Sequence, residues 1–255
     1  VGRALAQRLA PGMAEAAALA LIRGDPAAVS SAAPPYRFPA WALDWHEAEL
    51  GLPTGWPRGG ADGYTCFFAE SFLDEVAHAA NQEPVSYRIG MLGGDARAAR
   101  CLSTAASLGG WDGGAAGSGQ GIALHSMRGS HVAVLAEAGL ENGRVKVERL
   151  VAAVDCGRVV NPELVKQQIE GGLIFGLAQA TGAATGYARN VATATSMGDL
   201  KLPRLADTPD ITVELIRSDA PPGGVSEIAV PLVAPAVANA LATVTGRRWR
   251  GLPLV

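Results

Sequence analysis

Residues 131–155 read HVAVLAEAGLENGRVKVERLVAAVD. Apolar side chains alternate with polar or small ones on both sides of Asn142-Gly143, and an Asn-Gly pair between two alternating runs is typical of a tight β-hairpin. The stretch therefore predicts two antiparallel strands, at 131–137 and 145–154, joined by a short turn.

Helical patterns surround this hairpin. Asn161 precedes Pro162 and a long apolar run, which predicts a capped helix reaching Gly182. Further elements are expected as a short helix after Pro84, a helix over 97–108, a strand over 210–217 and a last helix over 234–245. Because these helices and hairpins show no regular strand–helix–strand alternation, the sequence predicts an α+β fold with antiparallel hairpins packed against helices.

The segment before the hairpin combines two patterns. Prolines interleave with apolar and polar pairs over 34–63, which predicts one or two strands and a tight loop at 53–63. The following run, 66–80, has the spacing of an amphipathic helix. Its predicted buried face comprises Phe67, Phe68, Phe72, Leu73, Val76 and Ala77, and its predicted solvent face comprises Glu70, Asp74 and Glu75.

The chain is expected to divide into a lead-in and a main region. Residues 1–33 are Ala- and Leu-rich and break at Pro11-Gly12, which indicates a helical lead-in from an upstream part that is missing here. Residues 34–255 form the main region, in which two subdomains are expected to meet near the glycine-rich stretch 109–121. That stretch precedes a strand instead of opening a helix, which favours a flexible connector over a phosphate cradle.

Composition excludes several classes of function. The 255 residues carry a net charge of −3 without a block of like charge, which argues against nucleic-acid binding. No apolar run reaches the roughly 20 residues of a membrane-spanning helix. The cysteines and histidines lack the spacing of a disulfide framework, a metal site or a catalytic triad; they are Cys66, Cys101 and Cys156, and His46, His78, His125 and His131.

Three separated segments carry motifs. The first joins Val154–Pro162 (VDCGRVVNP) to Gln168–Leu177 (QIEGGLIFGL). The second is Ser218–Glu227 (SDAPPGGVSE), which ends just before the last predicted helix. The third joins Gly55–Gly59 (GWPRG) to Glu70–Glu75 (ESFLDE).

In this order the segments resemble the carboxy-terminal part of the molybdopterin-binding large subunit of the xanthine dehydrogenase and aldehyde oxidase family. The resemblance is to the isoquinoline 1-oxidoreductase β-subunit type in particular, and it covers nearly all of residues 34–254. It implies a molybdenum hydroxylase, which oxidises an N-heterocycle or an aldehyde with water as the source of oxygen.

The resemblance also implies roles for individual residues. Glu227 matches the family's catalytic carboxylate, and a carboxylate suits this chemistry because the reaction needs a general base. Arg58 matches an arginine that lines the site and orients substrate or stabilises negative charge. The residues expected to contact the cofactor are Gln168, Gly171, Gly224, Val225 and Ser226.

Each residue also has a plainer interpretation. Glu227 could cap the last helix, Gln168 could be an exposed residue like Gln167, and Arg58 could be a solvated loop arginine. Packing between helices explains Gly171 and Gly172 almost as well as a cofactor does. The sequence departs from the family where Trp56-Pro57 precedes Arg58, at Ser226, where close relatives often have glycine, and over 182–200, where a strand pair is expected only in blurred form.

The implied partners follow from the same resemblance. The cofactor is a molybdopterin, with the cytosine dinucleotide form as one alternative. Since the cysteines do not cluster, [2Fe-2S] clusters are expected on a separate iron-sulfur small subunit. A cytochrome is one candidate electron acceptor, and the upstream part of the large subunit is a further partner. A non-catalytic homologue with a structural or assembly role is the main alternative, followed by a small-molecule carrier. The charge excludes neither the periplasm nor the cytoplasm.

Overall fold

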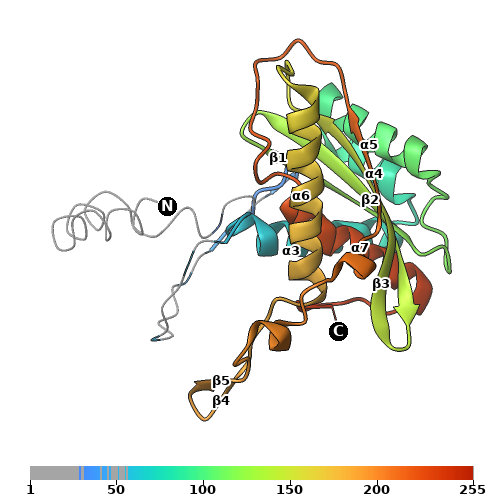
Figure 1. The fold of residues 1–255 in the computed structure, drawn as a ribbon. Coiled ribbons are helices and arrows are strands. Elements are labelled where there is room, and N and C mark those ends of the chain that lie inside the picture. The colour runs from blue at the N-terminus through green and yellow to red at the C-terminus, as the bar shows by residue number, and fades with distance from the viewer. Residues whose placement is uncertain are drawn as a thin grey trace.

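A four-stranded sheet with helices on both faces forms the centre of the protein (Figure 1). The structure is a computed structural model and describes residues 29, 32–40, 42–44, 46, 51, 55 and 57–254. The helices are α3 (Asp62–Ala79), α4 (Pro84–Met91), α5 (Ala96–Gly109), α6 (Pro162–Thr181) and α7 (Val230–Thr245). The strands are β1 (Gln120–Met127), β2 (Ser130–Glu141), β3 (Arg144–Asp155), β4 (Tyr187–Ala188), β5 (Val191–Ala192) and β6 (Asp210–Leu215), and two short 3-10 turns lie at Met197–Leu200 and Leu205–Asp207.

The sheet has the order β1-β2-β3-β6. Its first three strands are antiparallel neighbours, whereas β6 runs parallel to β3 and is reached through α6. The predicted hairpin is confirmed: Asn142 and Gly143 both have positive φ, 51° and 74°, as a two-residue hairpin turn requires. The α+β class is also confirmed, with this single parallel crossover added to the antiparallel hairpins.

Alternate residues of each strand enter two separate cores, because successive side chains of a strand point to opposite faces. On one face, Val132, Val134 and Val154 pack with residues of α6 and α7. On the other face, Ala133, Leu135 and Val151 pack with residues of α4 and α5. Both faces are covered, which explains why the middle of β2 is buried almost without interruption.

The helix beginning at Asn161 is confirmed and its start follows the expected chemistry. The Asn161 side chain accepts a hydrogen bond from the Leu164 amide at 3.1 Å, and Pro162 occupies the first turn. The short helix after Pro84, the helix near 97–108 and the strand near 210–217 are confirmed as α4, α5 and β6. The last helix begins earlier than expected, at Val230, and it accommodates Pro231 and Pro235.

Two expectations before the hairpin differ from the structure. The described residues of 34–63 contain no strand, and Pro34, Pro35 and Pro39 remove backbone donors there. For the other residues of this range, the expected strands stay a prediction. The faces predicted for helix α3 are wrong in part. Phe67, Leu73 and Ala77 are buried as expected, but Phe68 and Phe72 are 59 % and 64 % exposed, whereas Glu70 and Asp74 are buried.

Buried ion pairs explain why two carboxylates of α3 lie inside the protein. Arg88, which is fully buried, donates from Nε to Glu70 Oε2 at 3.0 Å and from Nη1 to Asp74 Oδ1 at 3.4 Å. Arg248 donates to Asp74 Oδ2 at 2.7 Å. Glu70 Oε2 also accepts the Leu124 amide of edge strand β1 at 3.1 Å. These four side chains, Glu70, Asp74, Arg88 and Arg248, are called the Arg88 cluster below, and they hold the acidic face of α3 against the sheet.

Some expectations stay predictions. The helices expected within 3–23, and most of the lead-in, lie outside the described residues, as does Trp56. Residues 109–121 connect α5 to β1. The division of 34–255 into two subdomains that meet there stays a prediction.

Candidate active site

The first two motif segments lie against each other beyond the end of β3. Arg158 donates its amide to the Ala220 carbonyl at 2.9 Å, and Gly223 donates its amide to the Cys156 carbonyl at 2.8 Å. Gly157 has a φ of +71°, and a Cβ at this residue would lie 2.1 Å from the Pro221 carbonyl oxygen. Glycine is therefore required there, because only an unsubstituted backbone can approach the 218–227 loop so closely.

Arg97 of α5 secures this junction. Its guanidinium donates to both carboxylate oxygens of Asp155, at 3.1 and 2.7 Å, and to the Gly129 carbonyl at 3.1 Å. Burial disfavours the ionised Asp155, but hydrogen bonds from Arg97, the Gly157 amide and Ser218 outweigh it and lower the pKa of this carboxyl below its ordinary value. Asp155 is therefore an anion that Arg97 holds in place at the end of β3.

Arg58 joins all three motif segments. It donates from Nε to the Ser226 carbonyl at 2.7 Å and from Nη2 to the carbonyl and the Oε1 of Gln168, both at 3.1 Å. Gln179, on the same helix as Gln168, donates back to the Arg58 carbonyl at 3.4 Å. These contacts distinguish Gln168 from Gln167 and tie α6 to the loop that carries Glu227. Arg58, Gln168 and Ser226 are called the Arg58 cluster below.

The glycines of α6 have different surroundings. A Cβ at Gly176 would lie 2.5 Å from the Val230 carbonyl oxygen, and one at Gly172 would lie 3.2 Å from Ala229 Cβ, so both residues permit close packing of α6 on α7. Gly171 is exposed, and a Cβ there would meet only Arg58 Nη1, at 3.7 Å. Helix packing therefore explains Gly172 and Gly176 but not Gly171.

Glu227 lies at the end of the 218–227 loop, which packs against the β1–β2 turn. Gly224 donates its amide to the Arg128 carbonyl at 3.1 Å, and a Cβ at Gly224 would lie 3.2 Å from Arg128 Cβ. The Glu227 side chain is 26 % exposed, and its Oε2 lies 3.6 Å from Nη2 of Arg128. Val225, the neighbouring predicted contact, is partly buried against the core.

The structure does not support a capping role for the Glu227 side chain. Helix α7 has Ala229 at its N-cap position without a side-chain cap, and only the backbone carbonyl of Glu227 accepts a hydrogen bond, from the Val230 amide at 3.0 Å. The Glu227 carboxylate is therefore not used by the helix.

Arg128 lies beside Glu227 in the candidate site, although no motif pointed to it. Its position depends on how the 218–227 loop packs on the turn. One signal was available: Arg128-Gly129 separates two apolar runs, as a hairpin turn does.

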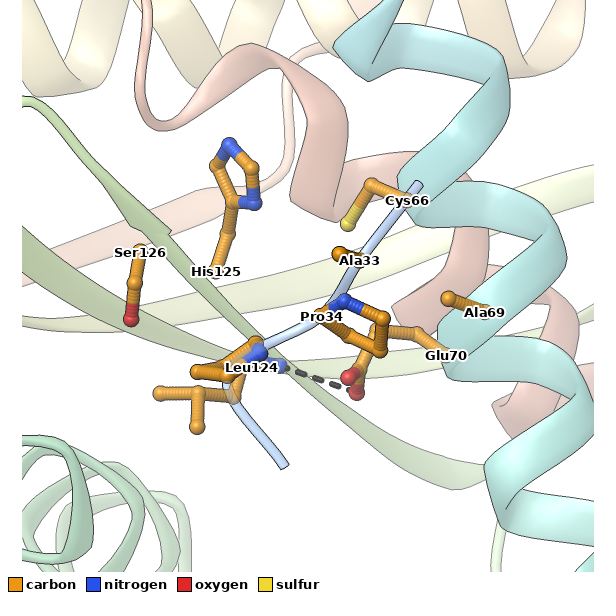
Figure 2. Close-up of a pocket in the computed structure, with 9 residues that line it drawn as sticks. Ala33, Pro34, Cys66, Ala69, Glu70, Leu124, His125 and Ser126 are labelled. Atoms are coloured by element: carbon orange, nitrogen blue, oxygen red, sulfur yellow. Dashed lines mark hydrogen bonds between the residues drawn. The ribbon is translucent and has the colours of Figure 1, made fainter. Parts of the chain in front are cut away.

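The predicted residues line an open surface and not the cavity shown in Figure 2. That cavity, of about 160 Å³, lies between α3 and β1 and is lined by Cys66, Glu70, Leu124, His125 and Ser126, together with Ala69 and residues 33–35. The hydrogen bond from the Leu124 amide to Glu70 crosses it in Figure 2.

Other features of the described residues bear on the chemistry. Cys66, Cys101 and Cys156 are buried and unpaired, and burial raises the pKa of the Cys101 thiol to about 12. Within the described part of the chain, no three His, Cys, Asp or Glu residues are grouped as a metal site would need. The helices described there are also too short or too polar to span a membrane.

Comparisons with known proteins agree with the motifs. A family described as the molybdopterin cofactor-binding domain matches residues 99–209, a range that includes Gln168 and Gly171. The beta subunit of isoquinoline 1-oxidoreductase from Brevundimonas diminuta is 31 % identical over 225 residues, which make up 86 % of this chain and 29 % of the relative. A subunit of nicotinate dehydrogenase from Pseudomonas putida is 28 % identical over 242 residues, which make up 87 % of this chain and 20 % of the relative.

A solved structure shares the fold. Aldehyde oxidoreductase from Desulfovibrio gigas superposes with a TM-score of 0.59 at 13 % identity, over 77 % of this chain and 40 % of that one. This chain therefore spans less than half the length of the proteins that it matches.

Proposed function

This chain belongs to the molybdopterin-binding subunits of the xanthine dehydrogenase family, and we propose that it forms part of a molybdenum hydroxylase. The proposed enzyme oxidises an N-heterocycle or an aldehyde and takes the oxygen from water. The names of the relatives point in the same direction, since they include an isoquinoline oxidoreductase and a nicotinate dehydrogenase.

The observation that carries the proposal is the meeting of three segments at Arg58. The loop of Arg58, the helix of Gln168 and the loop of Glu227 are separated by more than 50 residues each, yet one guanidinium bonds to both of the others. The contacts to Ser226 and to the Gln168 backbone are made to carbonyls, so Arg58 sets the spacing between these two backbones. We assign Arg58 this positioning role in place of direct contact with substrate.

The exposed residues next to Arg58 fit a molybdopterin. Gln168 Oε1 accepts from Arg58, which orients the amide and directs its two Nε2 donors toward other groups. Gly171 lies on the same exposed face of α6 and leaves open the space that a Cβ would fill. A glycine within a helix costs about 1 kcal/mol relative to alanine, and no neighbour among the described residues accounts for it at Gly171.

Glu227 is the proposed general base. Its carboxylate is partly exposed, is not engaged in capping α7, and lies one residue from the carbonyl that Arg58 holds. When bound, the molybdenum cofactor supplies the two-electron redox chemistry. The Glu227 carboxylate accepts the proton from the water-derived oxygen as that oxygen is transferred to the substrate carbon. Gly224, Val225 and Ser226 fix the backbone that leads to this carboxylate.

We propose that the remaining parts of the enzyme lie on a partner subunit and on the upstream part of the large subunit. The three cysteines of this chain are buried and widely separated, so [2Fe-2S] clusters are assigned to a partner subunit, from which a cytochrome could receive the electrons. The upstream part of the large subunit would complete the cofactor site, and the cytosine dinucleotide is one form that the cofactor could take.

The proposal is tested with the native assembly, purified from a host that makes the cofactor. Elemental mass spectrometry is expected to give about one molybdenum per copy of this chain. Glu227→Gln is expected to retain that molybdenum and to lower kcat by roughly 10²- to 10⁴-fold, the usual contribution of a general base. Glu141→Gln, at the far end of β2, serves as the matched control and is expected to leave both quantities unchanged.

Two results would contradict the proposal. An intact assembly without molybdenum would favour a structural or assembly role for the chain. A Glu227→Gln assembly with normal molybdenum and normal turnover would remove Glu227 from the chemistry.

A further inference from the structure

The arginines near Glu227 differ in how their donors are used. Arg58 and Arg97 each make three or more hydrogen bonds within the chain. Arg128 lies 3.6 Å from Glu227 Oε2, which is longer than a hydrogen bond, and its guanidinium makes no hydrogen bond to the described residues. Its side chain is 63 % exposed. The donors of Arg128 are therefore available at the edge of the proposed reaction site.

The backbone holds Arg128 in this place. Arg128 and Gly129 form the two-residue turn between β1 and β2, with φ values of 49° and 81°. The first of these positions favours Asn, Asp or Gly, and a residue with a long side chain there retains some backbone strain. Gly224 packs directly on the arginine: a Cβ at this position would lie 3.2 and 3.3 Å from Arg128 Cβ and Cδ. The glycine of the Glu227 loop thus leaves room for the arginine stem.

We propose that Arg128 binds a carboxylate of the substrate and that this enzyme prefers aromatic or heteroaromatic substrates that carry one. This inference rests on the proposed function, because it takes Glu227 as the base beside the reacting carbon. A guanidinium offers two donor edges, and one edge can face Glu227 while the other binds a carboxylate with two parallel hydrogen bonds. Since Arg128 lies next to Glu227, the substrate carboxylate would lie on the same side of the site as the proposed base.

Two neighbouring arginines are already engaged. Arg97 is paired with Asp155, and Arg58 bonds to carbonyl and amide oxygens. Among the described residues, Arg128 is the cation that lies within 4 Å of Glu227.

The first test measures binding without turnover. Calorimetry on the molybdenum-loaded assembly uses benzoate as the probe and benzamide as its neutral match. Wild type is expected to bind benzoate more tightly than benzamide, and Arg128→Gln is expected to abolish that preference. Arg144→Gln, at the opposite end of β2 and β3, removes the same charge and is expected to preserve it. Equal affinities in wild type, or an unchanged preference in Arg128→Gln, would overturn the proposal.

The second test measures specificity with two matched pairs, 4-formylbenzoate with benzaldehyde and nicotinate with nicotinamide. Arg128→Gln is expected to lower kcat/KM for the carboxylates by about 10- to 100-fold, mainly through KM, and to change it less than about 3-fold for the neutral compounds. Arg128→Lys is expected to recover part of the loss, because it keeps the charge without the paired donors. An equal loss for both members of a pair would overturn the proposal.

The molybdenum content separates the remaining outcomes. If Arg128→Gln assemblies lose molybdenum, the anion bound by Arg128 belongs to the cofactor and the substrate assignment is wrong. If wild type contains molybdenum and oxidises benzaldehyde but Arg128→Gln changes nothing, this inference fails and the proposed function stands. If wild type contains no molybdenum, both fail.

Discussion

The Arg88 cluster and the Arg58 cluster are each built around an arginine, but the two arginines have different partners. Arg88 is fully buried and faces two carboxylates, so its charge is neutralised inside the protein. Arg58 is partly exposed, and it bonds to two carbonyls and one amide oxygen without a carboxylate partner among the described residues. The partners of an arginine thus indicate its role. Buried carboxylates make Arg88 essential for the fold, whereas backbone carbonyls make Arg58 a spacer between α6 and the loop of Glu227.

The largest effect is expected from Arg88→Met. The substitution leaves the Glu70 carboxylate buried without its charged partner and leaves Asp74 with Arg248 as its remaining arginine partner. Breaking a buried pair in this way costs about 3 to 5 kcal/mol. The free energy of unfolding of the assembly, measured in denaturant, should fall by that amount. Arg250→Met, which removes an exposed pair with Glu75, is the matched control and should change little. Comparable losses in the two variants would contradict the structural role of the Arg88 cluster.

A smaller effect is expected from Arg97→Gln, which removes the donors that hold Asp155. Hydrogen bonds to charged groups contribute about 1.5 to 3 kcal/mol, and the unfolding free energy at pH 7 should fall by that order. Because the pKa of Asp155 is lowered in the folded state, its contribution is complete above the unfolded pKa of about 4 and is lost as the pH falls through the folded pKa.

The difference between wild type and Arg97→Gln should therefore shrink as the pH falls below about 4. Urea unfolding at pH 7 and at low pH measures it, with Arg144→Gln as the control for loss of one positive charge. A difference that is independent of pH would show that Arg97 acts through packing alone.

The smallest effects are expected from two glycines on one helix. Gly176→Ala forces α6 away from α7 and should destabilise the protein by about 1 to 3 kcal/mol. Gly171→Ala meets no close neighbour and should stabilise the helix by up to about 1 kcal/mol while lowering the molybdenum content. Thermal unfolding and elemental analysis of both variants measure this contrast. Unchanged molybdenum in Gly171→Ala would remove that glycine from the cofactor site.

Local signals made the hairpin and α6 predictable. Asn142-Gly143 selects its turn through backbone conformation, and Asn161-Pro162 begins α6 through a cap and a fixed φ, so neither element depends on distant residues. The α+β class follows from the order of such elements.

The faces of α3 were not predictable from that helix alone. Its hydrophobic pattern places Phe68 and Phe72 inside, but Arg88 and the free edge of β1 lie elsewhere in the sequence and draw Glu70 and Asp74 into the protein. A pattern within one helix contains no information about a charged partner contributed by another.

The candidate site was likewise predictable only in part from the sequence. Motif resemblance selected Arg58, Gln168 and Glu227 before any contact was known, and the structure brings their segments together. The motif resemblance could not select Arg128, because that arginine lies near Glu227 only through the packing of the 218–227 loop on a β-turn. Their roles in binding and catalysis stay predictions.

Molybdenum content in Arg58→Met shows whether Arg58 assembles the site without being required for the fold. We expect a folded assembly whose thermal midpoint lies close to that of wild type and whose molybdenum per chain falls well below one. An assembly that unfolds as readily as Arg88→Met, or one that keeps full molybdenum and full turnover, would contradict it.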